Sequence, residues 1–179
     1  MALPITLLTL FALGILIIDL MIPPECKWVN GVTAFIGVLF AAGGVVKIQF
    51  WMEANKSAGS LGMMHTMLVD RFALYFFYLF LASTGISILM SMRYMQTEHE
   101  NHGEYYTLML LSVVGMMCMA AGFDIVLIFI GLELMAISTY VLVGFLRRDR
   151  RSNEAALNIC YWARSPPAFL LMVFRCFTV

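Results

Sequence analysis

Residues 124–146 read DIVLIFIGLELMAISTYVLVGFL, and the interpretation of the whole chain starts from this stretch. It is long enough to cross a bilayer as one helix, because a transmembrane helix needs about 20 mostly apolar residues. Glu133 is its only charged residue between Asp124 and Arg147. At the helical rise, Glu133 lies roughly 13–14 Å from Asp124, which places it near the middle of the hydrocarbon layer.

A carboxylate at this depth costs on the order of 3 kcal/mol or more to insert, so it is expected to be paired, protonated or facing water inside the protein. We interpret Glu133 as a proton-relay or ion-pathway residue. The alternative is a polar residue that is tolerated where two helices touch. Its helical neighbours one turn away, Phe129, Ile130, Ala136 and Ile137, are all apolar. A polar partner for Glu133 is therefore expected from another helix.

The composition places the chain in a membrane. Of its 179 residues, 62% are hydrophobic and 12% are charged, a more apolar balance than soluble domains have. Continuous apolar runs predict helices, whereas a transmembrane barrel would show short alternating segments. The net charge of zero gives no reason to expect nucleic acid as a partner. The fold class predicted is an all-α polytopic transmembrane helix bundle.

Five apolar runs delimit the expected helices. Two turn or loop segments separate them clearly: Pro23-Pro24 ends the first run, and residues 52–69 are expected to form a polar loop. Asp19, in the last turn of the first run, is expected to be an interfacial acid, and Asp70 suits a helix N-terminus. The first run has no basic leader or cleavage site, which favours a retained helix. The predicted helices span about 3–22, 30–51, 70–94, 105–121 and 124–146.

With five spans, successive loops alternate between the two sides of the membrane. One side carries six basic residues, namely Lys27, Arg93, Arg147, Arg148, Arg150 and Arg151, and the other carries Lys47, Lys56 and Arg71. Because cytoplasmic loops are enriched in Lys and Arg, we expect the Arg147–Arg151 loop in the cytoplasm and the N-terminus outside.

No metal or disulfide site is expected. The four cysteines, Cys26, Cys118, Cys160 and Cys176, contain no C-x-x-C spacing. His99 and His102 are three residues apart, but a solvated loop explains the same polar composition. His65 has no partner at ligand spacing.

Three motifs occur in order in the C-terminal half: GEYY from Gly103, GLELMAISTYVLVGF from Gly131 and EAAL from Glu154. Together they resemble subunit N of the bacterial NADH–quinone oxidoreductase, respiratory complex I, an antiporter-like relative of mitochondrial subunit 2. The resemblance is specific over residues 103–157 and general before them. It implies that this chain corresponds to the N-terminal five to six helices of a subunit of about fourteen, and that Glu133 matches a family glutamate.

The resemblance implies proton translocation coupled to electron transfer from NADH to quinone. It places NADH, FMN, iron–sulfur clusters and quinone in the whole complex, with no cofactor in this chain. The implied partners are other membrane subunits of complex I and the lipid bilayer, in a bacterial inner membrane. Two alternatives stay open: a cation/proton antiporter or membrane-bound hydrogenase subunit of the same fold, and a non-catalytic scaffold or inert fragment.

The tail after Leu157 departs from the family, which continues from EAAL into KYFLLGAFSS, so that a family lysine stands where this chain has Asn158. Here Arg164 and Pro166-Pro167 interrupt the expected sixth helix. Reading the genetic code one base out of phase permits the family's own continuation, and it forces leucine at the Cys160–Tyr161 junction whatever the codons. We hypothesise a single-base deletion at Asn158, so that residues 158–179 form a frameshifted tail after a transmembrane domain at 1–157. Family-like nucleotide sequence beyond codon 157 would support it, and an in-frame stop after Val179 with no such sequence would refute it.

Overall fold

The computed structural model describes residues 3–21, 28–54, 59–62, 67–98 and 103–145, together with residues 154, 155, 157–159 and 161. Within these residues it has five long helices, each long and apolar enough to cross a membrane. This confirms the predicted all-α polytopic bundle. The helices are α1 (Leu3–Met21), α2 (Trp28–Ala54), α3 (Arg71–Glu98), α4 (Gly103–Ala121) and α5 (Ile125–Val143).

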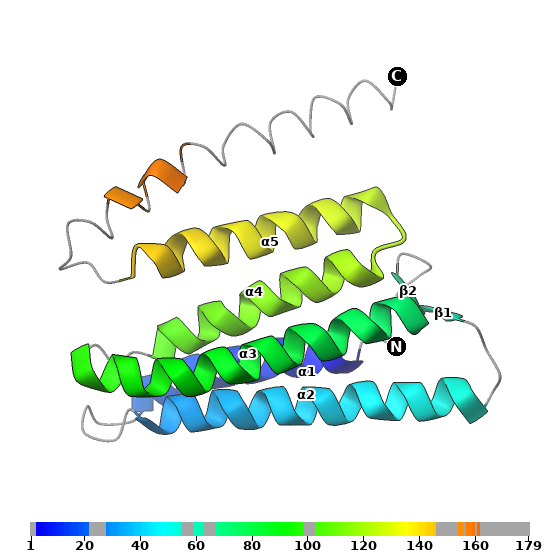
Figure 1. The fold of residues 1–179 in the computed structure, drawn as a ribbon, viewed down its shortest axis with the longest axis horizontal. Helices are drawn as coiled ribbons and strands as arrows, with labels where there is room; N and C mark the ends of the chain where they lie inside the picture. The colour runs from blue at the N-terminus through cyan, green and yellow to red at the C-terminus, as the bar shows by residue number, and fades with distance from the viewer. Residues whose placement is uncertain are drawn as a thin grey trace.

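The five helices lie lengthwise beside one another and reverse direction at each connection (Figure 1). Helix α4 is central, because it packs against α1, α2, α3 and α5. Helix α5 lies beyond α4 at the edge of the bundle and packs mainly against it. In the membrane-spanning window of α4, 50% of the residues are buried, against 11% in that of α5. The helix that carries Glu133 is therefore the most peripheral of the five.

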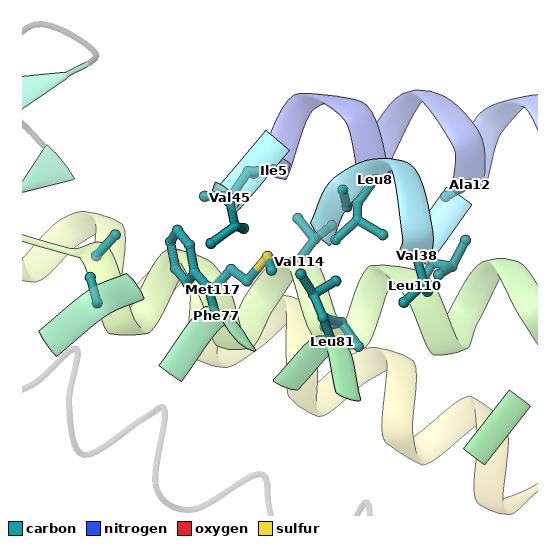
Figure 2. Packing of buried hydrophobic residues seen from close by; sticks show 14 of the residues in the cluster. Ile5, Leu8, Ala12, Val38, Val45, Phe77, Leu81, Leu110, Val114 and Met117 are labelled. Carbon is teal, nitrogen blue, oxygen red and sulfur yellow. The ribbon is translucent and has the colours of Figure 1, made fainter. Parts of the chain in front are cut away.

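The core lies among α1, α2, α3 and α4. Figure 2 shows Phe77 of α3 beside Met117 of α4, with Val45 of α2 and Ile5 of α1 close by. Phe77 and Met117 are fully buried. Lipid tails are as apolar as these side chains, so close packing, more than the exclusion of water, holds such helices together.

The expectation of a polar loop at residues 52–69 is wrong in two respects. Helix α2 continues to Ala54, and an antiparallel hairpin of β1 (Gly59–Gly62) and β2 (Met67–Asp70) follows. Met67 and Val69 are buried while the residues between and after them are half-buried, which is the alternation of a strand with one covered face. Met67 also bridges to Gly122 at the turn between α4 and α5. Each strand has only four residues, and β1 has a glycine at both ends, so the pattern of apolar residues does not predict the hairpin.

Two helix starts are capped by acids. The carboxylate of Asp70 accepts a hydrogen bond from the backbone N–H of Ala73 at 2.8 Å, and that of Asp124 accepts one from Val126 at 3.2 Å. Four other helix ends differ from expectation by two to four residues: α2 starts at Trp28, α3 continues to Glu98, α4 starts at Gly103 and α5 ends at Val143. Helices α2, α3 and α4 extend past their apolar runs, which apolar pattern alone does not predict, whereas α5 ends earlier than its apolar run, with Gly144 as its C-cap.

Candidate functional site

Glu133 is the ninth residue of the 19-residue helix α5, one position from its centre. Its side chain is half-buried, and its Oε1 atom is buried without a hydrogen-bond partner. The residues that the structure describes thus supply neither a hydrogen bond nor an ion pair to this oxygen. Burying a carboxylate oxygen without a hydrogen bond costs free energy. A bound proton or a hydrogen-bond donor would stabilise Glu133 at this position.

Helix α5 is held in place by direct backbone contact with α4. A Cβ atom at Gly115 would lie 2.6 Å from the carbonyl oxygen of Gly131 and 2.7 Å from the backbone nitrogen of Met135. A Cβ atom at Gly131 would lie 2.8 Å from the carbonyl oxygen of Gly115. Only glycine permits this approach at both positions, in the manner of small-residue contacts between transmembrane helices.

This contact determines the direction of Glu133. Two residues along a helix correspond to a turn of about 200°, so Glu133 lies on the side of α5 opposite to Gly131 and α4. Of its neighbours one turn away, Ile130 and Ile137 are more than half exposed, Phe129 is half-buried and Ala136 is buried. The position of Glu133 on α5 therefore lies away from the contact with α4. Among the described residues, no side chain of α1–α4 donates a hydrogen bond to the buried oxygen of Glu133, and the expected partner from another helix stays a prediction.

A second polar site was missed in the sequence. Asn30 in the first turn of α2 is fully buried, and its Nδ2 donates a hydrogen bond of 2.5 Å to Asp19 Oδ1 on α1. The other amide atom, Asn30 Oδ1, is buried without a hydrogen-bond partner among the residues that the structure describes. A Cβ atom at Gly103 would lie 2.7 Å from Asp19 Cβ. Asp19 is therefore half-buried at a junction of three helices and is more than an interfacial acid.

Further hydroxyl groups surround this junction. Thr107 Oγ1 of α4 donates toward the carbonyl oxygens of Ala12 and Gly103, at 3.2 and 3.1 Å. Tyr106 is buried, and its hydroxyl would lie 3.1 Å from a Cβ atom at Gly31. These residues are separated by up to about ninety positions in the chain, so no local sequence signal could have grouped them.

Several residues considered above lie outside the described part of the chain. They are Cys26, Cys160, Cys176, His65, His99, His102 and residues 146–153 and 162–179. The frameshift hypothesis, which starts at Asn158, concerns mainly these residues. Among the described residues there is no group of three or more His, Cys, Asp or Glu that could hold a metal ion.

Comparison with known proteins gives consistent similarities. The chain is 49% identical over 161 residues to NADH-quinone oxidoreductase subunit N 1 of Koribacter versatilis, covering 88% of this chain and 32% of that protein. It is 37% identical over 173 residues to NADH-quinone oxidoreductase subunit N 2 of Solibacter usitatus, covering 96% and 35%. It is 30% identical over 165 residues to NAD(P)H-quinone oxidoreductase subunit 2 of a Synechocystis strain, covering 91% and 32%.

No family profile matches the chain. The chain spans about one third of the length of the curated relatives that it matches. The similarity to these three proteins extends over 88% to 96% of this chain, so it covers the bundle and is not confined to a short motif.

Proposed function

We propose that this chain, which belongs to the subunit N family of NADH-quinone oxidoreductases, forms part of a membrane subunit that couples electron transfer from NADH to quinone with proton translocation. One observation carries the proposal: a carboxylate near the centre of a membrane-spanning helix has a buried oxygen to which none of the described residues donates a hydrogen bond. Natural sequences keep such a group in lipid where it serves a pathway for protons or ions. The family membership indicates that the transported ion is the proton and that the subunit works within a respiratory complex.

In this proposal Glu133 takes up a proton and passes it on. A carboxylate in an apolar helix bundle is stabilised either by a proton or by a cationic partner, and it exchanges one state for the other when a charge approaches. Because the position of Glu133 lies away from the contact with α4, the partner belongs to a segment that lies against the outer face of α5. That segment is expected in the two thirds of the relatives' length that this chain does not span.

The redox chemistry belongs elsewhere in the complex. We assign NADH, FMN, iron–sulfur clusters and quinone to partner subunits, and proton transfer alone to this one. The relatives' names favour this function over a cation/proton antiporter or a membrane-bound hydrogenase subunit. We place the protein in the inner membrane of a bacterium, with the N-terminus outside and the Arg147–Arg151 loop in the cytoplasm.

A glutamate-to-glutamine substitution in a full-length relative, at the position that corresponds to Glu133, tests the proposal. Glutamine has nearly the same shape but cannot release a proton, so we expect proton pumping driven by NADH in membrane vesicles to fall by about tenfold or more. Aspartate at the same position keeps an exchangeable proton and is expected to retain part of the activity.

The matched control is Glu104→Gln, which removes an exposed carboxylate from the first turn of α4, at one end of the span. Pumping should be unchanged in this control. Native gel electrophoresis verifies that both variant subunits are assembled into the complex. Normal pumping by an assembled Glu133→Gln complex would remove the relay role.

A further inference from the structure

A cavity of about 360 Å³ lies between the end of α2 and the start of α3, two helices that pack side by side (Figure 1). Its polar lining consists of Gln49 and Glu53 from α2 and of Arg71, Tyr75 and Tyr78 from α3. The proposed proton pathway uses none of these residues. The cavity thus brings one cation, one anion and two phenol groups to a single place that has no role so far.

The lining of the cavity is ordered by two hydrogen bonds. The hydroxyl of Tyr78 donates to Gln49 Oε1 at 2.9 Å, and Gln49 Nε2 donates to Glu53 Oε1 at 3.3 Å. The first bond joins α3 to α2, and the second, within α2, holds one carboxylate oxygen of Glu53 at the α2 wall. Arg71 stands on the α3 wall, and the structure, which describes both side chains, forms no ion pair between Arg71 and Glu53. Two opposite charges therefore share a cavity without neutralising each other by contact.

The cavity lies at the level of lipid headgroups. Helix α2 has 27 residues. At the helical rise this length is about 40 Å, compared with a hydrocarbon layer of about 30 Å. The last turn of α2, which carries Glu53, therefore extends beyond the acyl chains. Arg71 is the first residue of α3, and Tyr75 is well exposed one turn later, as expected for an aromatic residue at the membrane boundary.

We propose that this cavity binds the headgroup of a phospholipid that carries both a phosphate and a primary amine. The guanidinium of Arg71 binds the phosphate, because its fork of N–H donors matches phosphate oxygens. The carboxylate of Glu53 accepts hydrogen bonds from the ammonium group, and Tyr75 provides an aromatic face beside it. The acyl chains lie along exposed apolar residues of the same helices, such as Leu79 and Val46.

The arrangement discriminates between headgroups. A choline headgroup has the same charges, but its quaternary nitrogen has no N–H to donate to Glu53. A glycerol headgroup has the phosphate but no cation, so Glu53 disfavours it. An isolated phosphate ion would meet the same repulsion and would lack the acyl contacts. The ligand with matching charge at both walls is therefore phosphatidylethanolamine or a lipid of the same chemistry.

Native mass spectrometry of the purified chain in detergent tests the proposal, with dioleoyl phosphatidylethanolamine, phosphatidylcholine and phosphatidylglycerol as probes. We expect the ethanolamine lipid to bind about tenfold more tightly than the other two, equivalent to one charge-assisted hydrogen-bond pair. Glu53→Gln should lower the affinity for the ethanolamine lipid to that for the choline lipid. Arg71→Gln should weaken the binding of all three lipids, because each of them has a phosphate.

The matched control is Lys47→Gln, which removes an exposed charge from the same end of α2 outside this cavity. It should leave the order of the three lipids unchanged. Glu53 and Arg71 are both exposed, so their variants are expected to fold, and far-ultraviolet circular dichroism verifies the helix content. Equal binding of the three lipids, tightest binding of the glycerol lipid, or an equal effect of Lys47→Gln and Glu53→Gln would overturn the proposal. None of these outcomes depends on proton translocation.

Discussion

At the scale of single residues, Asn30 and Glu133 are two polar side chains with buried atoms that differ in their hydrogen bonding. The Nδ2 atom of Asn30 donates to Asp19 on the neighbouring helix, although its Oδ1 atom has no partner among the described residues. The buried oxygen of Glu133 also has no hydrogen bond to a described residue, but a carboxyl group can take up and release a proton, which an amide cannot. The bond between two helices supports a structural role for Asn30, and the ionisable group near the middle of a membrane-spanning helix is why we propose a functional role for Glu133.

Replacing Asn30 with leucine is expected to destabilise the bundle. The substitution removes the donor to the half-buried carboxylate of Asp19, and the loss of such a bond costs about 1–3 kcal/mol. Unfolding by sodium dodecyl sulfate in mixed micelles measures the change. Ser87→Ala is the control, because the exposed Ser87 hydroxyl bonds only to its own helix, at Ser83. Equal stability of Asn30→Leu and the wild type would show that the hydrogen bond contributes nothing.

At the scale of elements, the contact between α4 and α5 determines which way the functional helix faces. Helix α5 is apolar on all sides, so amphipathic patterning could not orient it. The approach of Gly115 and Gly131 does so, because their backbones meet where any side chain would intervene. The rotation of α5 that this contact imposes places Glu133 on the outer face.

Gly115→Ala is expected to lower the stability of the α4–α5 pair. The new methyl group would lie 2.6 Å from a backbone oxygen, which cannot move as a flexible side chain does. Overpacking of this kind costs about 1–3 kcal/mol. Gly43→Ala is the matched control, since nothing lies within 4 Å of a Cβ atom there. An alanine at Gly43 should be neutral or stabilise its helix by up to about 1 kcal/mol. Similar unfolding curves for the two variants would contradict the close backbone contact.

At the scale of the whole molecule, the alternating helices set which loops share a side of the membrane. The hairpin adjoins the start of α3 and bridges to the turn before α5, so these segments lie at one end of the bundle. The C-terminal ends of α1, α3 and α5 lie at the other end of the bundle. The proposed orientation places the end with the hairpin outside the cell.

Cysteine labelling tests that orientation. In a background whose four native cysteines are replaced by serine, Lys56→Cys should react with an impermeant maleimide in intact spheroplasts. Asp149→Cys should react only after the membrane is opened, because the basic loop that contains it is held in the cytoplasm. The opposite pattern would invert the orientation, and labelling of both from one side would contradict the five-span arrangement.

The sequence alone predicted the five long apolar helices of the described residues and the place of Glu133 near the middle of one of them, because apolar runs and distance along a helix are local properties of the chain. It could not predict the hairpin, whose strands are too short, nor the bond between Asn30 and Asp19, which joins two helices. Tertiary structure decided the face of α5 that carries Glu133, since an evenly apolar helix can rotate freely until two glycine backbones meet. It also brought Arg71 and Glu53 to one cavity, because only the packing of α2 against α3 places their ends together.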